Sequence, residues 1–200
     1  MLLLSESAAW ADPASRSVFP SRRVGGGTRG DCSSRMLAHL VPSNGEFSPA
    51  SDGLIGLVEG QAASPRPLAV SFKPLRSWQA GTTDSGATIK ELQLSAQGPS
   101  VRLLRIGPVK EPMVWESAYL CGDATSTSSS DPLAYIQTIS PPALSLLKPA
   151  GVSKGGADRL ALQKLASACG AQVSREQVIA AFGLQEMAAA LTPTLPVICQ

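Results

Sequence analysis

The sequence predicts a mainly β protein, an antiparallel β-sandwich or open barrel followed by three to four short helices. Two patterns indicate this fold class. Between residues 35 and 123, short apolar runs are separated by Gly, Pro and Ser, and many short strands with turn signals are typical of antiparallel sandwiches and barrels. Beyond the Ser- and Thr-rich stretch at 124–130, the spacing of apolar residues changes to that of helices.

Each apolar run of the first half predicts one strand. The expected strands begin at Arg35, Gly53, Pro67, Ala87, Ser100 and Pro112, and read RMLAHLVP, GLIGLVEG, PLAVSF, ATIKELQL, SVRLLRI and PMVWESAYLC. In the last of them Met113, Trp115, Tyr119 and Cys121 fall on one face, because successive side chains of a strand point to opposite faces. We therefore expect about six strands in the sandwich.

The second half predicts helices. Asp131 followed by a proline is a good start for a short helix that runs to Ile139. A second helix is expected where apolar side chains recur at the spacing of one helix face, namely at Leu162, Leu165, Ala166 and Cys169. Gly170 is placed to end that helix, and Ser174 with Gln177 predicts a capping box at the start of the next.

These patterns divide the chain into five segments. They are the remnant of a truncated signal peptide at 1–11, a flexible, basic, Gly-rich segment at 12–34, the sandwich domain at 35–123, a Ser/Thr linker at 124–130 and a helical C-terminal region at 131–200.

The N-terminal residues predict export. Ala9 and Ala11 fit the small-residue pockets of signal peptidase, so we expect cleavage between Ala11 and Asp12 and a periplasmic or extracellular protein. The leucine run from Met1 to Leu4 is too short to engage a translocon, and we therefore expect the true start to lie upstream. The alternative is an ordinary disordered N-terminus.

The four cysteines are Cys32, Cys121, Cys169 and Cys199. They form no CxxC pair, and with His39 as the only histidine they do not match the usual Cys/His zinc sites. We expect disulfides from Cys32 to Cys121 and from Cys169 to Cys199, because each pair brackets one compositional half of the chain. The alternative is four buried free thiols.

Charge and hydropathy limit the partners. The net charge of +2 is too small to steer a polyanion, so nucleic acid is not an expected partner. None of the apolar runs approaches the roughly 20 residues that span a bilayer, so we do not expect an integral membrane protein. The sequence indicates no cofactor or metal.

Several motifs have functional and structural interpretations. Gly25, Gly27 and Gly30 match GxGxxG but lack the strand before and the helix after that a dinucleotide loop requires, so a flexible basic loop is the better interpretation. Ser145 and Lys148 spell SxxK, which we interpret as coincidence, with Ser145 in a helix. The candidate contacts for a ligand or partner are Arg22, Arg23, Arg29 and Trp78.

His39 and residues 160–184 each have a functional and a structural interpretation. The lone His39 alternates with apolar neighbours, which favours a satisfied or half-exposed strand histidine over a general base. Residues 160–184 resemble a helix-turn-helix, but Val178 comes about two residues later than the tight turn allows.

The stretch RRVGGGTRGDC from Arg22, followed by LAHLVP, resembles the N-terminal signature of a cyanobacterial exported family, domain of unknown function family 928. The later WESAYLC resembles its second cysteine-bearing strand, and the resemblance covers roughly residues 22–123. It implies an all-β secreted body and supports the Cys32 to Cys121 pairing. It implies no known activity.

We therefore expect an exported, non-enzymatic binding or scaffolding module whose partner is an envelope protein or glycan. The alternative is a small envelope-associated hydrolytic enzyme, and a lesser alternative is a DNA-binding segment at 160–184. Trp78, Trp115 and Tyr119 could anchor a partner, although aromatic side chains in so aromatic-poor a chain are first of all core material. A pocket that holds His39 and two acidic side chains would favour the enzyme.

Overall fold

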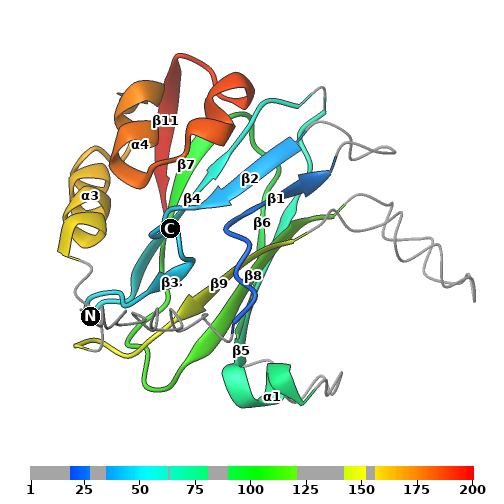
Figure 1. Cartoon of the computed structure of the whole chain (residues 1–200). Coiled ribbons are helices and arrows are strands. Elements are labelled where there is room, and N and C mark those ends of the chain that lie inside the picture. Colours follow the sequence, from blue (N-terminus) through cyan, green and yellow to red (C-terminus); the bar gives the residue numbers. More distant parts are fainter. Residues whose placement is uncertain (1–18, 28–34, 63, 81–89, 121–141, 152–155) are drawn as a thin grey trace, which may run out of the picture.

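The computed structural model describes residues 19–27, 35–62, 64–80, 90–120, 142–151 and 156–200. Within them the chain forms two mixed β-sheets that face each other, with helices over the outer side of one sheet and a further short helix beside the other (Figure 1). The prediction of a mainly β protein with short helices is confirmed at this level. None of the helices in these ranges is long and apolar enough to cross a membrane.

One sheet has six strands in the order β1-β2-β4-β7-β11-β10, and the other has five in the order β3-β9-β8-β5-β6. The strands are β1 (Val24–Gly27), β2 (Arg35–His39), β3 (Glu46–Phe47), β4 (Leu54–Glu59), β5 (Leu68–Pro74), β6 (Lys90–Leu94), β7 (Ser100–Arg105), β8 (Met113–Tyr119), β9 (Ala143–Leu147), β10 (Gln172–Ser174) and β11 (Thr194–Cys199). The helices are α1 (Leu75–Gln79), α3 (Gly156–Ser167), α4 (Arg175–Phe182) and the 3-10 helix η3 (Gln185–Ala190).

The six strands predicted from the first half of the sequence correspond to β2 and β4 to β8. In β5 the burial of side chains alternates along the strand, as expected when one face lies on the core. β8 turns Trp115 and Tyr119 into the core, where both are fully buried. β4 is buried along its whole length because the five-stranded sheet covers one of its faces and the helices cover the other.

The sheets are mixed rather than antiparallel, which corrects the expected sandwich. β11 runs parallel to β7, and β3 runs parallel to β9. Hairpins join antiparallel neighbours, but both of these pairs bring together strands that lie far apart in the sequence. The direction of such strands is set by the route of the chain between them, which short sequence patterns do not encode.

The C-terminal region is only partly helical. Besides helices it supplies β9, β10 and β11, and Ser145 lies in β9 instead of the helix that we expected. The proline-bearing tail forms β11, in which Pro196 pairs with Gln172 of β10 before the parallel pairing with β7 begins at Val197. Proline is tolerated there because a missing N–H is harmless where a strand has a neighbour on only one side. The expected helix from Asp131 lies outside the described residues.

The predicted capping box is confirmed. The Ser174 hydroxyl accepts a hydrogen bond from the Gln177 backbone N–H at 3.2 Å, and the Gln177 side chain accepts one from the Ser174 N–H at 3.4 Å. Gly183 ends α4 with a φ of 61°, a left-handed conformation that glycine adopts without strain. Val178 and Phe182 of α4, with Leu162 of α3, then pack into the main core over the six-stranded sheet.

One polar contact spans the main core between the two sheets. Arg102 of β7 and Glu59 of β4 form an ion pair at 2.9 Å between Nε and Oε1, and both side chains are at most 1% exposed. Arg102 Nη2 also donates a hydrogen bond to the backbone oxygen of Ser95, just after β6, at 2.6 Å. The hydrogen bond from Arg102 to Ser95 therefore links the six-stranded sheet to the edge of the five-stranded sheet.

Candidate functional site

His39 lies at the centre of a second polar contact between the sheets. β2 turns its side chain inward, where it is fully buried. Its Nδ1 lies 2.8 Å from the Ser145 hydroxyl of β9, and its Nε2 lies 2.9 Å from the Ser117 hydroxyl of β8. The expectation of a satisfied strand histidine is thus confirmed, and both ring nitrogens are engaged by the opposite sheet.

Trp115 completes this His39 cluster, which comprises His39, Ser117, Ser145 and Trp115. The indole stacks on the imidazole with the ring centroids 3.5 Å apart and the planes 10° apart. Its Nε1–H donates to the Ser117 hydroxyl at 2.9 Å. Burial lowers the pKa of His39 well below its ordinary value of 6.5, because the cation loses hydration that the apolar surroundings do not replace. The cluster therefore holds a neutral imidazole.

The two serines of the cluster were missed in the sequence. Ser117 could have been found, since it lies on the face defined by Met113, Trp115 and Tyr119, where a polar residue needs an internal partner. Ser145 could not, because a short run around it reads equally well as helix or strand.

The Arg23 side chain is largely buried and binds backbone oxygens of the fold. Its guanidinium donates to the backbone oxygens of Phe182 at 2.7 Å and of Gly183 at 2.5 Å, and it lies 3.2 Å from the Glu186 carboxylate. A cation at the C-terminus of α4 satisfies carbonyl groups that the helix leaves unpaired and interacts favourably with the helix dipole.

The other arginines of the same predicted set lie apart from Arg23. Arg22 is exposed, and its Nε donates to the backbone oxygen of Pro142 at 3.0 Å. Arg29 lies outside the described residues. Of the three predicted arginine contacts, only Arg22 is therefore described with its side chain at the surface.

Trp78 lies at a different end of the molecule, on α1 beside the outer face of the five-stranded sheet. Its ring packs on Phe19 with the centroids 5.2 Å apart and the planes tilted by 56°. Both belong to a small apolar cluster outside the main core, the Trp78 cluster, which consists of Phe19, Leu75, Trp78, Val114, Leu144 and Leu146. Trp115 and Tyr119 are core residues, so Trp78 is the partly exposed member of the three aromatic side chains proposed as anchors.

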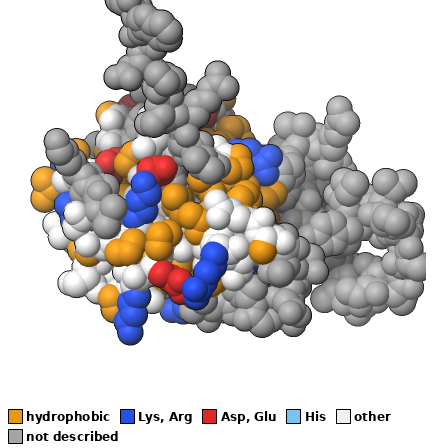
Figure 2. Space-filling model, turned by 60° about the horizontal axis from the view of Figure 1, so that its bottom comes forward, with side chains coloured by type: hydrophobic (Ala, Val, Ile, Leu, Met, Phe, Trp, Pro, Cys, Tyr) orange, Lys and Arg blue, Asp and Glu red, His pale blue; other side chains and the backbone are white. Residues whose placement is uncertain are grey.

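Charged pairs of opposite sign lie beside the Trp78 cluster. Arg76 of α1 pairs with Glu111 at 3.5 Å, and Lys73 of β5 pairs with Glu116 of β8 at 3.8 Å. Figure 2, which brings the end with α1 toward the viewer, shows hydrophobic side chains gathered next to basic and acidic ones on this face. The surface thus has an apolar centre with charges of both signs around it.

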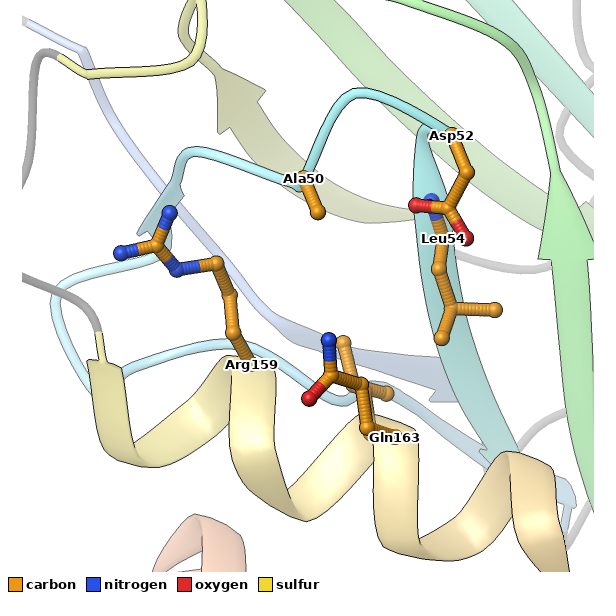
Figure 3. Close-up of a pocket in the computed structure, with 6 residues that line it drawn as sticks. Ala50, Asp52, Leu54, Arg159 and Gln163 are labelled. Carbon is orange, nitrogen blue, oxygen red and sulfur yellow. The ribbon is translucent and has the colours of Figure 1, made fainter.

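A shallow depression lies between α3 and the loop that leads into β4 (Figure 3). Arg159 and Gln163 of α3 face Ala50, Asp52 and Leu54 across it (Figure 3). The buried Leu162 also lines it. Its cavity volume is about 10 Å³, close to the space of one water molecule. It is too small to enclose a substrate.

The helices that resemble a helix-turn-helix are separated by β10, which pairs with β11. Arg175, the first residue of α4, donates to the backbone oxygens of Ala188 and Leu191 at 3.3 and 3.2 Å and pairs with Glu176 at 2.9 Å. Its guanidinium is thus used to hold the end of η3.

Cys169, just beyond α3, and Cys199 of β11 form a disulfide with their Cα atoms 5.8 Å apart. This bond ties the helical layer to an inner strand of the six-stranded sheet. Cys32, Cys121 and the expected cleavage site between Ala11 and Asp12 lie outside the described residues. Comparison of the chain with protein-family models, with curated proteins and with solved structures gave no match.

Proposed function

We propose that this chain is an exported, non-enzymatic binding module whose contact surface is the Trp78 cluster with the charged pairs beside it. The observation that supports this most is the position of Trp78, which is partly exposed while its ring packs on Phe19 outside the main core. A large aromatic side chain that its neighbours already hold loses little conformational freedom on binding. Such side chains are typical binding hot spots.

The partner that suits this surface is a protein. Protein interfaces have an apolar centre and a polar rim, and the Trp78 cluster has Arg76 with Glu111 and Lys73 with Glu116 beside it. We propose a partner with apolar side chains opposite Trp78 and charges of both signs around them. Complementary charges at such a rim set specificity and the rate of association more than affinity.

A hydrolytic enzyme is the alternative, and it would need His39 open to a substrate. His39 is instead fully buried, with Ser117 and Ser145 on its two ring nitrogens and Trp115 on its face. A buried ring whose nitrogens are both engaged supports a structural role and thus the binding module. The charge balance and the internal contacts of Arg175 argue in the same direction against DNA binding at 160–184.

Export is part of the proposal. The Cys169–Cys199 disulfide supports it, because such bonds persist mainly in oxidising compartments. We propose cleavage between Ala11 and Asp12 and a periplasmic or extracellular location, tested by N-terminal sequencing of the mature protein; a mature chain that keeps Met1 would contradict it. The pairing of Cys32 with Cys121 and membership of family 928 stay predictions, and non-reducing peptide mapping tests the pairing.

The binding surface is tested by photo-crosslinking in the native cells. A photoreactive amino acid replaces Arg76, whose side chain is 80% exposed beside Trp78, or Leu160 of α3, which is 67% exposed away from the cluster. We expect a discrete protein adduct from position 76 and none from position 160. Trp78→Ala, introduced together with the probe at position 76, should reduce that adduct at least tenfold.

Three outcomes would contradict the proposal: equal adducts from both positions, an adduct at position 76 that Trp78→Ala leaves unchanged, and an adduct that consists of glycan. The unfolding midpoint of Trp78→Ala is measured in parallel. If the unfolding midpoint falls sharply, Trp78→Phe is used in place of Trp78→Ala, because it keeps an aromatic ring against Phe19. The adduct from position 76 should then decrease in proportion to the indole surface that the variant lacks.

A further inference from the structure

The His39 cluster joins strands of both sheets through one titratable ring. His39 comes from β2 of the six-stranded sheet, and both hydroxyls that bind it come from β8 and β9 of the five-stranded sheet. It is also the only histidine of the chain. Any change of imidazole charge in this protein is therefore a change at the junction between the sheets.

The hydrogen bonds of the cluster suit a neutral ring. A neutral imidazole has one donor and one acceptor nitrogen, so Nδ1–H can donate to the Ser145 hydroxyl while Nε2 accepts from the Ser117 hydroxyl. The Trp115 N–H can only donate, and it already occupies one lone pair of the Ser117 oxygen. If both ring nitrogens donated, that oxygen would accept from His39 and Trp115 together, and its own proton would need a new partner.

The charged groups around His39 do not compensate a positive ring. Ser145 and Ser117 occupy its two nitrogens, so neither nitrogen bonds to a carboxylate. The charged side chains on the elements packed around β2 are engaged elsewhere: Glu59 with Arg102 on the inward face, Arg23 with Glu186 at the end of α4, Glu116 with Lys73 on the outer face of β8, and Glu46 with Lys148 next to β9.

We propose that His39 is an acid-sensitive latch between the two sheets, which the neutral ring closes and protonation of the ring opens. Mild acid then loosens the sandwich, and neutral pH restores it. The stacked position of Trp115 places an aromatic ring at the point where the sheets separate. The latch is independent of the Trp78 surface and of what binds there.

The direction of the change in stability with pH follows from proton linkage. Burial lowers the pKa of His39 in the folded chain, whereas the unfolded chain has the ordinary value of 6.5. Below pH 6.5 the unfolded chain therefore binds more protons than the folded chain, so stability is complete above this pH and is lost as the pH falls. If the folded ring stays neutral down to pH 5.0, the unfolding equilibrium constant rises about 30-fold between pH 7.5 and 5.0 through this one residue.

The test compares the wild-type chain with His39→Gln, which keeps a donor and an acceptor in the side chain but does not titrate. Urea unfolding of both proteins with disulfides intact, at pH 7.5 and 5.0, gives four equilibrium constants. We expect the constant of the wild type to rise about 30-fold more than that of the variant. An equal rise in both proteins would overturn the proposal.

A second measurement keeps the proposal testable if His39→Gln does not fold. The sole imidazole of the wild type gives one set of NMR signals, whose chemical shifts report ring protonation. In urea near the unfolding midpoint at pH 7.5, we expect the folded signals to stay those of a neutral ring from pH 7.5 to 5.0 while they lose intensity to the unfolded ones. A folded ring that titrates near pH 6.5 with no loss of intensity would overturn the latch.

Discussion

Replacing Arg102 by methionine should be among the most damaging single changes in the core. The substitution removes the guanidinium 2.9 Å from Glu59 and 2.6 Å from the Ser95 oxygen, in a site where both side chains of the ion pair are at most 1% exposed. Breaking a buried pair in this way costs about 3–5 kcal/mol, because the remaining charge loses its partner without regaining water. Stability of a single domain is itself only about 5–15 kcal/mol.

The double variant Glu59→Leu with Arg102→Met distinguishes the effect of losing a charge partner from the effect of losing side-chain volume. It removes both charges together and fills the space with apolar atoms, so its stability should return to within about 1 kcal/mol of the wild type or exceed it. Urea unfolding at pH 7.5, where the latch is closed, measures all of these variants. Lys73→Met is the matched control, since its pair with Glu116 is 3.8 Å long and about one-third exposed, and it should cost less than about 1 kcal/mol.

The reasoning would be refuted by either of two results. In the first, Arg102→Met costs no more than Lys73→Met, which would mean that the buried position carries no penalty. In the second, the double variant costs as much as Arg102→Met and Glu59→Leu added together, which would mean that the two side chains contribute independently.

Three other predictions can be checked by the same unfolding measurements. Gly53→Ala should lower the free energy of unfolding by well over about 2 kcal/mol, because Gly53 has a φ of 65° and a Cβ there would meet the backbone carbonyl of Gly107. Gly107 has a φ of 81° with open space around it, so Gly107→Ala should lower it by only about 1–2 kcal/mol, the strain of a left-handed alanine. Replacing Cys169 and Cys199 by serine should cost about 3–4 kcal/mol on the loop-entropy estimate, and a loss below about 1 kcal/mol would contradict a stabilising role. Ser174→Ala should cost about 1 kcal/mol through the lost cap of α4, and an unchanged midpoint would show that the cap is dispensable.

Local patterns predicted β2 and β4 to β8 but not how the strands pair, and they missed β1, β3, β9, β10 and β11. The alternation in Leu68–Pro74 and Met113–Tyr119 fixes which side chains point inward, and the Ser174 capping box marks the start of α4. The parallel pairing of Val197 with Val101 depends on contacts between distant segments, which no local spacing encodes. The helix expected at Ser145 is the strand β9, because a short apolar run fits a helix and a strand equally well.

The residues of the candidate sites were likewise predicted only in part from the sequence. That His39 would be a satisfied strand histidine followed from its apolar neighbours, whereas its partners Ser117 and Ser145 come from strands far along the chain. The sequence predicts a ligand or partner contact for Arg23, because a basic, glycine-rich stretch surrounds it. Its role at the end of α4 depends on Phe182 and Gly183, which only the fold brings near.

The place of β11 within the six-stranded sheet has a consequence for how the protein reaches this fold. β11 lies between β7 and β10, so the sheet has a gap until residues 194–199 arrive, long after β7 has been synthesised. Pairing of such distant segments is slow to form, since a large loop must close before any contact repays the lost entropy. During synthesis the open edge of β7 should therefore need protection from other unpaired strands.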